Sequence, residues 1–203
     1  MLTKVLDKKD ALTVWHFTES DGTLIRKGKH HGRRVRVKPG LVLRVKPPLV
    51  MCERGLHGSV RALDALDYAN TEERLGVSRC RVWGTVIVRY EKVVAEYREV
   101  VKFADCDKVV HEFACTCASD ALALIANPDP RSIEAVRVKR EWLAGRATDA
   151  ELAVAGAAAW AAAWAAARAV AWAAAGDAAR AAAWDAQNER LEKMLNDLLD
   201  GDK

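Results

Sequence analysis

Short runs of β-branched and apolar residues, separated by Gly and Pro, fill the first half of the chain. They predict strands over residues 12–17, 34–37, 41–45 and 49–52. Residues 79–90 alternate between apolar and polar types and predict a longer strand, with 93–103 as its antiparallel partner. One helix interrupts this series, and Ser59 is its expected N-cap. The pattern of the first half therefore indicates an α+β arrangement.

From Asp105 onward the spacing of apolar residues is helical. It predicts a helix over residues 109–126. Asp129 followed by Pro130 predicts the N-cap and first residue of a second helix, which ends at Gly145. Thr148-Asp149-Ala150-Glu151 has the capping-box pattern that opens a last helical region, and Gly176-Asp177 predicts a break within it.

These patterns together predict a fold class and a domain boundary. The fold class is α+β: a small antiparallel-sheet domain with one helix, followed by an all-α domain rich in Ala and Trp. The first domain is expected over residues 1–104 and the second over residues 105–203.

The last helical region is dominated by alanine, which occupies 22 of the 34 positions in 153–186. Alanine lets helices approach closely but buries little apolar area, so the tryptophans must carry much of the packing free energy. Two interpretations remain open. The helices pack within their own domain, or they form a surface that pairs with a second copy or another protein. The candidate interface residues are Trp160, Trp164, Trp172 and Trp184.

Positive charge is concentrated in one segment. The whole chain carries a net charge of +4, yet residues 22–50 contain nine Lys or Arg and no Asp or Glu, which leaves −5 for the remainder. Clustered cations attract phosphate-bearing partners such as nucleic acids. A solvated sheet face with a loop explains the same residues. The candidates for phosphate or partner contact are Lys27, Lys29, Arg33, Arg34, Arg36 and Lys38.

The cysteine count and the N-terminal sequence bear on compartment and cofactors. Five cysteines are an odd number without disulfide-framework spacing, which favours free thiols. Cys115 and Cys117 point in different directions on a helix and cannot chelate one ion, so no metal is expected, and no cofactor motif is found. The chain begins without an apolar leader and holds no apolar run long enough to span a bilayer. A cytoplasmic protein without a membrane partner is expected.

A glycine-flanked turn at residues 52–59 is the most concentrated group of chemically active side chains. Gly55 and Gly58 let the backbone approach another group closely, and a helix beginning after the turn offers its N-terminus to an anion. A turn that simply needs Gly and an N-cap explains the pattern equally. The candidate residues of this turn are Cys52, Glu53, His57 and Ser59.

Several sequence stretches resemble known families. The run LVMCERGLHGSVRALDALDYA, followed by CRVWGTV, resembles a family of phage and actinobacterial proteins with the pattern LCERGLHAS…DAL-YA…CRV. This chain has Gly58 where that pattern has Ala. The helical half, with HEFACTCASDALAL and AWDAQNERLEKML, is similar to the helical region of proteins named as immunity proteins. These resemblances imply a fold and no particular activity.

A looser likeness concerns ADP-ribosyltransferase-like folds. In those folds an early strand supplies His or Arg, a later strand supplies Ser or Tyr before a helix, and a last strand supplies Glu. The matching residues are His16, Ser59 and either Glu96 or Glu99. This likeness implies that they bind the nicotinamide ribose of NAD and polarise its glycosidic bond.

Three hypotheses of function follow. The sequence contains no P-loop, GxSxG, HExxH or dinucleotide fingerprint, which favours a non-enzymatic binding protein that occupies a partner's surface in an immunity-type or host-interaction role. The first alternative is an NAD-using transferase or a degenerate relative. The second is a protein that binds the phosphate backbone of a nucleic acid through residues 22–50.

Overall fold

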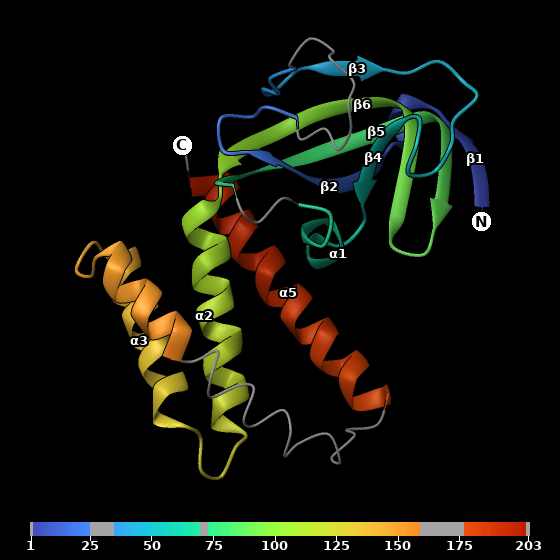
Figure 1. Ribbon diagram of the computed structural model, residues 1–203. Helices are drawn as coiled ribbons and strands as arrows, with labels where there is room; N and C mark the ends of the chain where they lie inside the picture. Colours follow the sequence, from blue (N-terminus) through green and yellow to red (C-terminus); the bar gives the residue numbers. More distant parts are fainter. Residues whose placement is uncertain (1, 25–34, 70–72, 159–176, 202–203) are drawn as a thin grey trace. The chain divides into compact units, whose positions relative to one another are not determined.

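The computed structural model describes residues 2–24, 35–69, 73–158 and 177–201. The chain divides into two compact units. We call Met1–Asp107 together with Asn188–Lys203 the sheet unit, and Lys108–Gln187 the helical unit. All the strands named below belong to the sheet unit (Figure 1).

Within the described residues, six antiparallel strands form one sheet in the order β1-β5-β2-β4-β6-β3, and β5 also pairs with β6. Because β5 pairs with β2, β2 with β4, β4 with β6 and β6 with β5, these four strands close the sheet on itself. The strands are β1 (Leu2–Leu6), β2 (Leu12–Glu19), β3 (Val42–Arg44), β4 (Leu56–Ser59), β5 (Leu75–Arg89) and β6 (Lys92–Asp105). A 3₁₀ turn, η1 (Lys8–Asp10), joins β1 to β2.

The closed sheet encloses a core made mainly of valine. β-Branched side chains suit extended backbone and pack well on a pleated surface. Two register shifts bend the long β5–β6 pair, one of them between Trp83 and Val86, where Gly84 has a φ of 78°. A Cβ at Gly84 would lie 2.8 Å from the ring of Tyr97, so only glycine fits there. The core residues are Val14, Val37, Cys80, Val82, Val86, Val93, Ala95 and Val100.

The C-terminal part of helix α5 (Asp177–Gly201) belongs to the sheet unit. Leu191 and Leu195 are fully buried there. Polar contacts add to this packing: Asn196 accepts a hydrogen bond from Arg79 (3.0 Å), and Lys102 of β6 pairs with Asp200. α5 is therefore fixed to the sheet by both apolar burial and polar contacts.

α5 also caps the short helix α1 (Ala62–Leu66). The N-cap residue Arg61 makes no side-chain capping bond, and Ser59 lies two residues earlier, at the end of β4. The capping acceptors come instead from α5, where Glu192 accepts from the Ala62 amide (3.1 Å) and Asn188 from the Leu63 amide (2.9 Å). The prediction that Ser59 is the N-cap is wrong, because acceptors distant in sequence satisfy the first amides of the helix.

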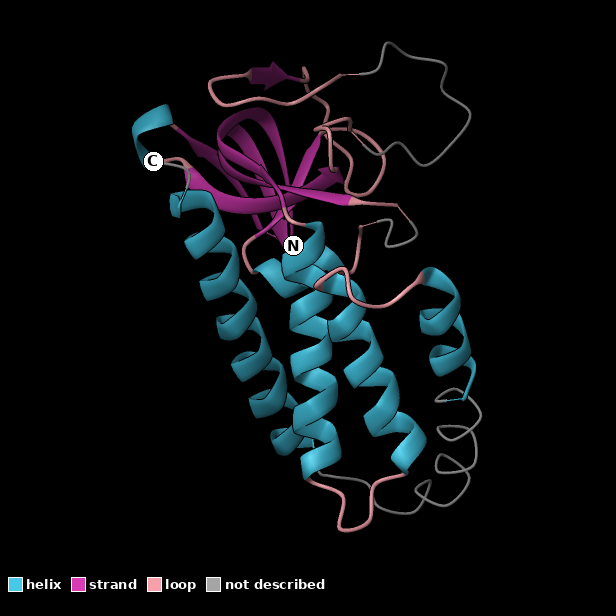
Figure 2. Cartoon of the chain, turned by 90° about the vertical axis from the view of Figure 1, so that its left-hand side faces the viewer, coloured by secondary structure: helices cyan, strands magenta, loops and turns pink. Residues whose placement is uncertain are grey.

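The helical unit confirms several local predictions. It holds α3 (Pro130–Leu143) and most of α2 (Asp107–Ala123), and residues 149–158 are also helical. Asp129 accepts from the Arg131 amide (2.8 Å) as N-cap of α3, Gly145 follows α3 with a φ of 72°, and Glu151 and Thr148 exchange the capping-box hydrogen bonds. Figure 2 shows the helices in cyan and the strands in magenta. Among the described helices, none is both long and apolar enough to cross a membrane.

The expected fold class, a small sheet domain followed by an all-α domain, is wrong. The sheet is large, with six strands spread over residues 2–105, and β5 and β6 contribute 15 and 14 residues. Strand β1 was missed because four of its five residues are exposed, so it lacks the buried face that alternation reveals. Residues 188–203, expected in the helical domain, group with the sheet instead.

We expect Leu195→Ala to lower the free energy of unfolding by about 2–5 kcal/mol, because it removes a fully buried side chain and leaves a cavity. Urea unfolding followed by circular dichroism measures the change. Leu124→Ala is the matched control, since Leu124 is 89% exposed and should cost less than about 0.5 kcal/mol. Equal losses in the two variants would contradict the packing of α5 on the sheet.

Candidate functional site

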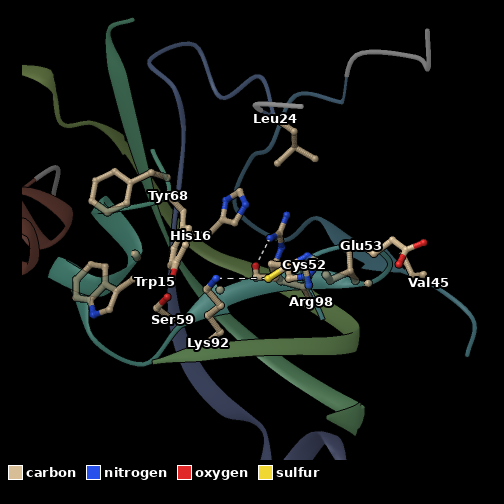
Figure 3. A pocket seen from close by; sticks show the side chains of 16 residues that line it. Trp15, His16, Leu24, Val45, Cys52, Glu53, Ser59, Tyr68, Lys92 and Arg98 are labelled. Carbon is tan, nitrogen blue, oxygen red and sulfur yellow. Dashed lines mark hydrogen bonds between the residues drawn. The ribbon is translucent and has the colours of Figure 1, made fainter. Parts of the chain in front are cut away.

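A cleft of about 770 Å³ opens in the sheet unit beside β2, β4 and the start of β6. Its volume lies in the range of small-molecule sites. Apolar side chains form much of the wall, and polar groups lie among them (Figure 3). The apolar residues are Trp15, Phe17, Leu24, Val45, Leu56 and Ala65, and the polar ones are His16, Cys52, Glu53, His57, Ser59, Tyr68, Lys92 and Arg98.

The turn at residues 52–59 forms one wall of the cleft, and its glycines explain its shape. Gly55 has a φ of 142°, and a Cβ there would lie 2.1 Å from a methyl group of Val94. A Cβ at Gly58 would lie 2.8 Å from Val14. The close backbone approach that the sequence indicates is thus made to the protein's own valines.

His57 holds this turn from within. Its Nε2 accepts a hydrogen bond from the Cys52 amide (3.0 Å), which fixes Cys52 in the left-handed region with a φ of 65°. The imidazole also hydrogen-bonds the Gly55 backbone. Both interactions join His57 to the backbone of its own turn, so the side chain stabilises the conformation of the turn. Its Nε2 lone pair is already used and cannot accept a proton from a ligand.

Arg98 of β6 is the most unusual residue in the cleft. It is only 2% exposed, and burial lowers the pKa of its guanidinium. Its Nη1 donates to the His57 carbonyl (2.6 Å), and its Nε has no hydrogen-bond partner. Among the described residues, no carboxylate forms an ion pair with it. Buried guanidinium groups normally have an acidic partner, and in the part of the chain that the structure describes Arg98 has none.

Two histidines beside Arg98 are held in the neutral form. Burial lowers the pKa of His16 well below its ordinary value, and the charge on Arg98 and the proximity of His57 lower it further. Burial, followed by Arg98, also lowers the pKa of His57. The Nδ1 atom of His16 is buried without a hydrogen-bond partner. The interior of the cleft therefore combines one permanent cation with an unsatisfied imidazole nitrogen.

Lys92 and Tyr68 lie with Cys52 at another part of the cleft. Lys92 Nζ donates to Cys52 Sγ (3.4 Å) and lies 4.2 Å from the centre of the Tyr68 ring. Tyr68 in turn donates to Glu91 (2.9 Å). The cleft thus has a second positive charge, directly hydrogen-bonded to a thiol.

The structure brings together some of the residues predicted for NAD chemistry and leaves others apart. His16 and Ser59 both line the cleft. Glu96 instead pairs with Arg44 (3.0 Å), and Glu99 pairs with Lys8 (3.3 Å). Neither glutamate is among the described residues that line the cleft, so the acidic member of that set is not brought to the other two.

Most of the other sequence candidates lie outside the cleft or outside the described residues. Arg36 is exposed and pairs with Asp21, and Lys38 is exposed next to buried Val37. Trp184 is 38% exposed. The candidates outside the described residues are Lys27, Lys29, Arg33, Arg34, Trp160, Trp164 and Trp172, as is Gly176, where a helix break is predicted.

Sequence reasoning missed Arg98, Lys92, Tyr68 and Trp15 as site residues. Alternation from buried Val93 and Ala95 would place residue 97 inside the closed sheet and residue 98 outside. The register shift opposite Trp83 and Val86 reverses this order and buries Arg98. The glycine at position 84 was the available signal for that irregularity.

The polar residues of the cleft do not form a metal centre. In the part of the chain that the structure describes, no group of three or more His, Cys, Asp or Glu side chains is placed to hold a metal ion. Arg98, His16 and Lys92 bring charged and hydrogen-bonding groups to the cleft.

We expect His16 to make folding stability depend on pH. Its pKa is lower in the folded than in the unfolded protein, so the unfolded state takes up the proton first and stability falls as the pH drops below about 6.5. Urea unfolding between pH 5 and pH 8 measures this dependence. As the pH drops, the free energy of unfolding should fall less steeply in His16→Gln than in the parent protein, with a difference in slope of up to about 1.4 kcal/mol per pH unit. Superimposable profiles for the two proteins would contradict the burial of a neutral imidazole.

Comparison with protein-family models, with curated proteins and with solved structures found no match to this chain.

Proposed function

We propose that this protein binds a ligand with an anionic head, a phosphate or a carboxylate, and an apolar body. The head lies against Arg98, and the body lies along the apolar wall that includes Trp15, Phe17 and Leu24. The observation that carries this proposal is the guanidinium of Arg98, 2% exposed, with an unpartnered Nε and no paired carboxylate among the described residues.

The energetics favour an anion at this position. Removing a guanidinium from water costs several kcal/mol unless an opposite charge and hydrogen bonds replace its hydration. A phosphate or carboxylate supplies both, because its oxygens accept charge-assisted hydrogen bonds from guanidinium N–H groups. His16 adds a further polar atom, since its buried Nδ1 has no hydrogen-bond partner among the described residues. A bound anion would accept from Arg98, and it would accept from His16 as well in the tautomer that carries the ring proton on Nδ1.

Recognition fits this geometry better than catalysis does. His57, the histidine of the predicted turn, is held by the Cys52 amide and the Gly55 backbone. Glu96 and Glu99 are engaged in ion pairs with Arg44 and Lys8. The proposal keeps the expectation of a binding protein and assigns the anion contact to the cleft, because Arg36 of the basic segment already pairs with Asp21.

We expect phenylphosphate to raise the melting temperature of the protein more than inorganic phosphate does, because only phenylphosphate also covers the apolar wall. A ligand at a hundred times its Kd adds about 2.7 kcal/mol of stability, which shifts Tm by several degrees in a chain of this size. Differential scanning fluorimetry at constant ionic strength, with chloride as the reference anion, measures these shifts.

Arg98→Met should abolish the phosphate-induced shift without unfolding the ligand-free protein, because an apolar side chain of similar length replaces a buried, unpaired charge. Arg89→Met removes the same charge from an exposed position outside the cleft and should respond to phosphate like the parent protein. Equal phosphate shifts in the two variants, or none in the parent protein, would overturn the proposed function.

A further inference from the structure

We propose that Cys52 is a thiol-modification site that reacts with low-molecular-weight disulfides bearing a carboxylate, and that the carboxylate of the incoming group binds Arg98. This inference rests on the proposed function, because it uses the same anion contact. It adds a covalent reaction at the cleft and names the class of reactant.

Cys52 is distinguished from the other cysteines by its accessibility. All five cysteines are free, and Cys52 is exposed and lines the cleft. Cys80, Cys106 and Cys115 are buried, Cys117 is half-buried, and burial raises the pKa of the Cys80 thiol to about 11. A buried thiol is inert toward reagents in water, so Cys52 is the thiol that a disulfide reaches first.

The surroundings of Cys52 favour attack by its sulfur. The ammonium of Lys92 donates a hydrogen bond to Sγ (3.4 Å), which holds the sulfur beside a cation at the cleft. The Cys52 backbone is held in the left-handed region by the hydrogen bond that its amide donates to His57 Nε2. Such a conformation is unfavourable for a residue other than glycine and persists only where neighbouring groups enforce it. The thiol is therefore presented to the cleft in a fixed orientation.

Arg98 is a second observation, separate from Cys52, that points to an anionic reactant. It lines the same cleft as Cys52 (Figure 3). It is only 2% exposed, and its Nε has no hydrogen-bond partner among the described residues. His57 contacts both residues, because its ring accepts from the Cys52 amide (3.0 Å) and its carbonyl accepts from Arg98 (2.6 Å). His57 thus connects the backbone of Cys52 to the guanidinium of Arg98, and both side chains line the same cleft, which suits a small molecule that carries both a sulfur and a carboxylate.

The reaction is a thiol–disulfide exchange. Cys52 loses its proton to solvent, and its thiolate attacks one sulfur of the disulfide. A new S–S bond forms between Cys52 and that sulfur while the original S–S bond breaks. The departing sulfur leaves as a thiolate with the bonding electron pair and takes up a proton from solvent. The disulfide is the oxidant, Cys52 is oxidised, and no other reactant is needed.

The experiment compares three small disulfides that differ in charge: dithiodipropionate (anionic), 2-hydroxyethyl disulfide (neutral) and cystamine (cationic). Intact-mass kinetics and peptide mapping identify the modified cysteine and its rate. We expect Cys52 to be modified first, and dithiodipropionate to react roughly tenfold faster than cystamine, a ratio that corresponds to one favourable charge contact. Modification of another cysteine first, or faster reaction of cystamine, would overturn the proposal.

Variants separate the roles of the two cations. Arg98→Met should reduce the preference for dithiodipropionate, whereas Arg89→Met should preserve it. Lys92→Met should slow the reaction of Cys52 with the neutral 2-hydroxyethyl disulfide. This probe carries no charge for Arg98 to bind, so its rate reflects only the reactivity of the sulfur that Lys92 contacts. A preference unchanged by Arg98→Met would show that the carboxylate does not reach Arg98, and would overturn the assignment.

A protection measurement uses the unmodified protein and does not depend on variant folding. Phenylphosphate should slow the reaction of Cys52 with dithiodipropionate, because both compete for Arg98. Full reactivity under saturating phenylphosphate would contradict the inference.

The variant Cys52→Ser separates this inference from the proposed function. If Cys52→Ser still shows the phenylphosphate shift while the parent lacks the disulfide preference, only the thiol assignment fails. If the parent lacks the shift, the proposed function fails.

Discussion

The guanidinium of Arg98 is the constraint around which the cleft is arranged. It is buried in a closed sheet whose core is mainly valine, and one of its N–H groups donates a hydrogen bond to the His57 carbonyl. That bond positions β4, and the His57 ring then holds the Cys52 amide and the left-handed backbone of the turn. The shape of one wall of the cleft therefore depends on a buried cation. In the proposed function the remaining N–H groups of that cation select the ligand, because a charge that no described carboxylate pairs, in a poorly solvated position, favours an oppositely charged group.

Charge in the interior of the cleft is limited by mutual repulsion. Arg98 is positive at any accessible pH, and it lowers the pKa of both His16 and His57, each of which is already disfavoured as a cation by burial. Around neutral pH the interior thus holds one positive charge and two neutral imidazoles. An anion that binds Arg98 removes this repulsion, so it should also raise the pKa of His16. Binding and protonation are consequently coupled through the same pair of residues.

Local signals in the sequence predicted what local interactions determine. The alternation in residues 79–90, the Asp129-Pro130 pair and the Thr148–Glu151 capping box all specify structure within a few residues, and the structure confirms them. The predicted fold class was wrong for two reasons. Strand β1 is almost entirely exposed, so its sequence shows no alternation of buried and exposed positions, and the C-terminal part of α5 groups with the sheet. The turn at residues 52–59 and His16, which the sequence singles out because unusual residue types are visible there, line the cleft. Arg98 was not singled out, because a register shift decides which face of β6 it occupies, and strand register is a property of pairing between distant segments.

The C-terminal helix takes part in the site although it contributes no residue to the described lining of the cleft. Asn188 and Glu192 of α5 accept hydrogen bonds from the first amides of α1, which has no capping side chain of its own. Ala65 of α1 and Tyr68 just beyond it line the cleft, and Tyr68 lies against the Lys92 ammonium that contacts Cys52. A helix of five residues is too short to be stable alone. Its position therefore depends on α5, whose own position depends on the burial of Leu191 and Leu195. The physical connection runs from the apolar stripe near the C-terminus, through two capping side chains, to the lysine beside the thiol.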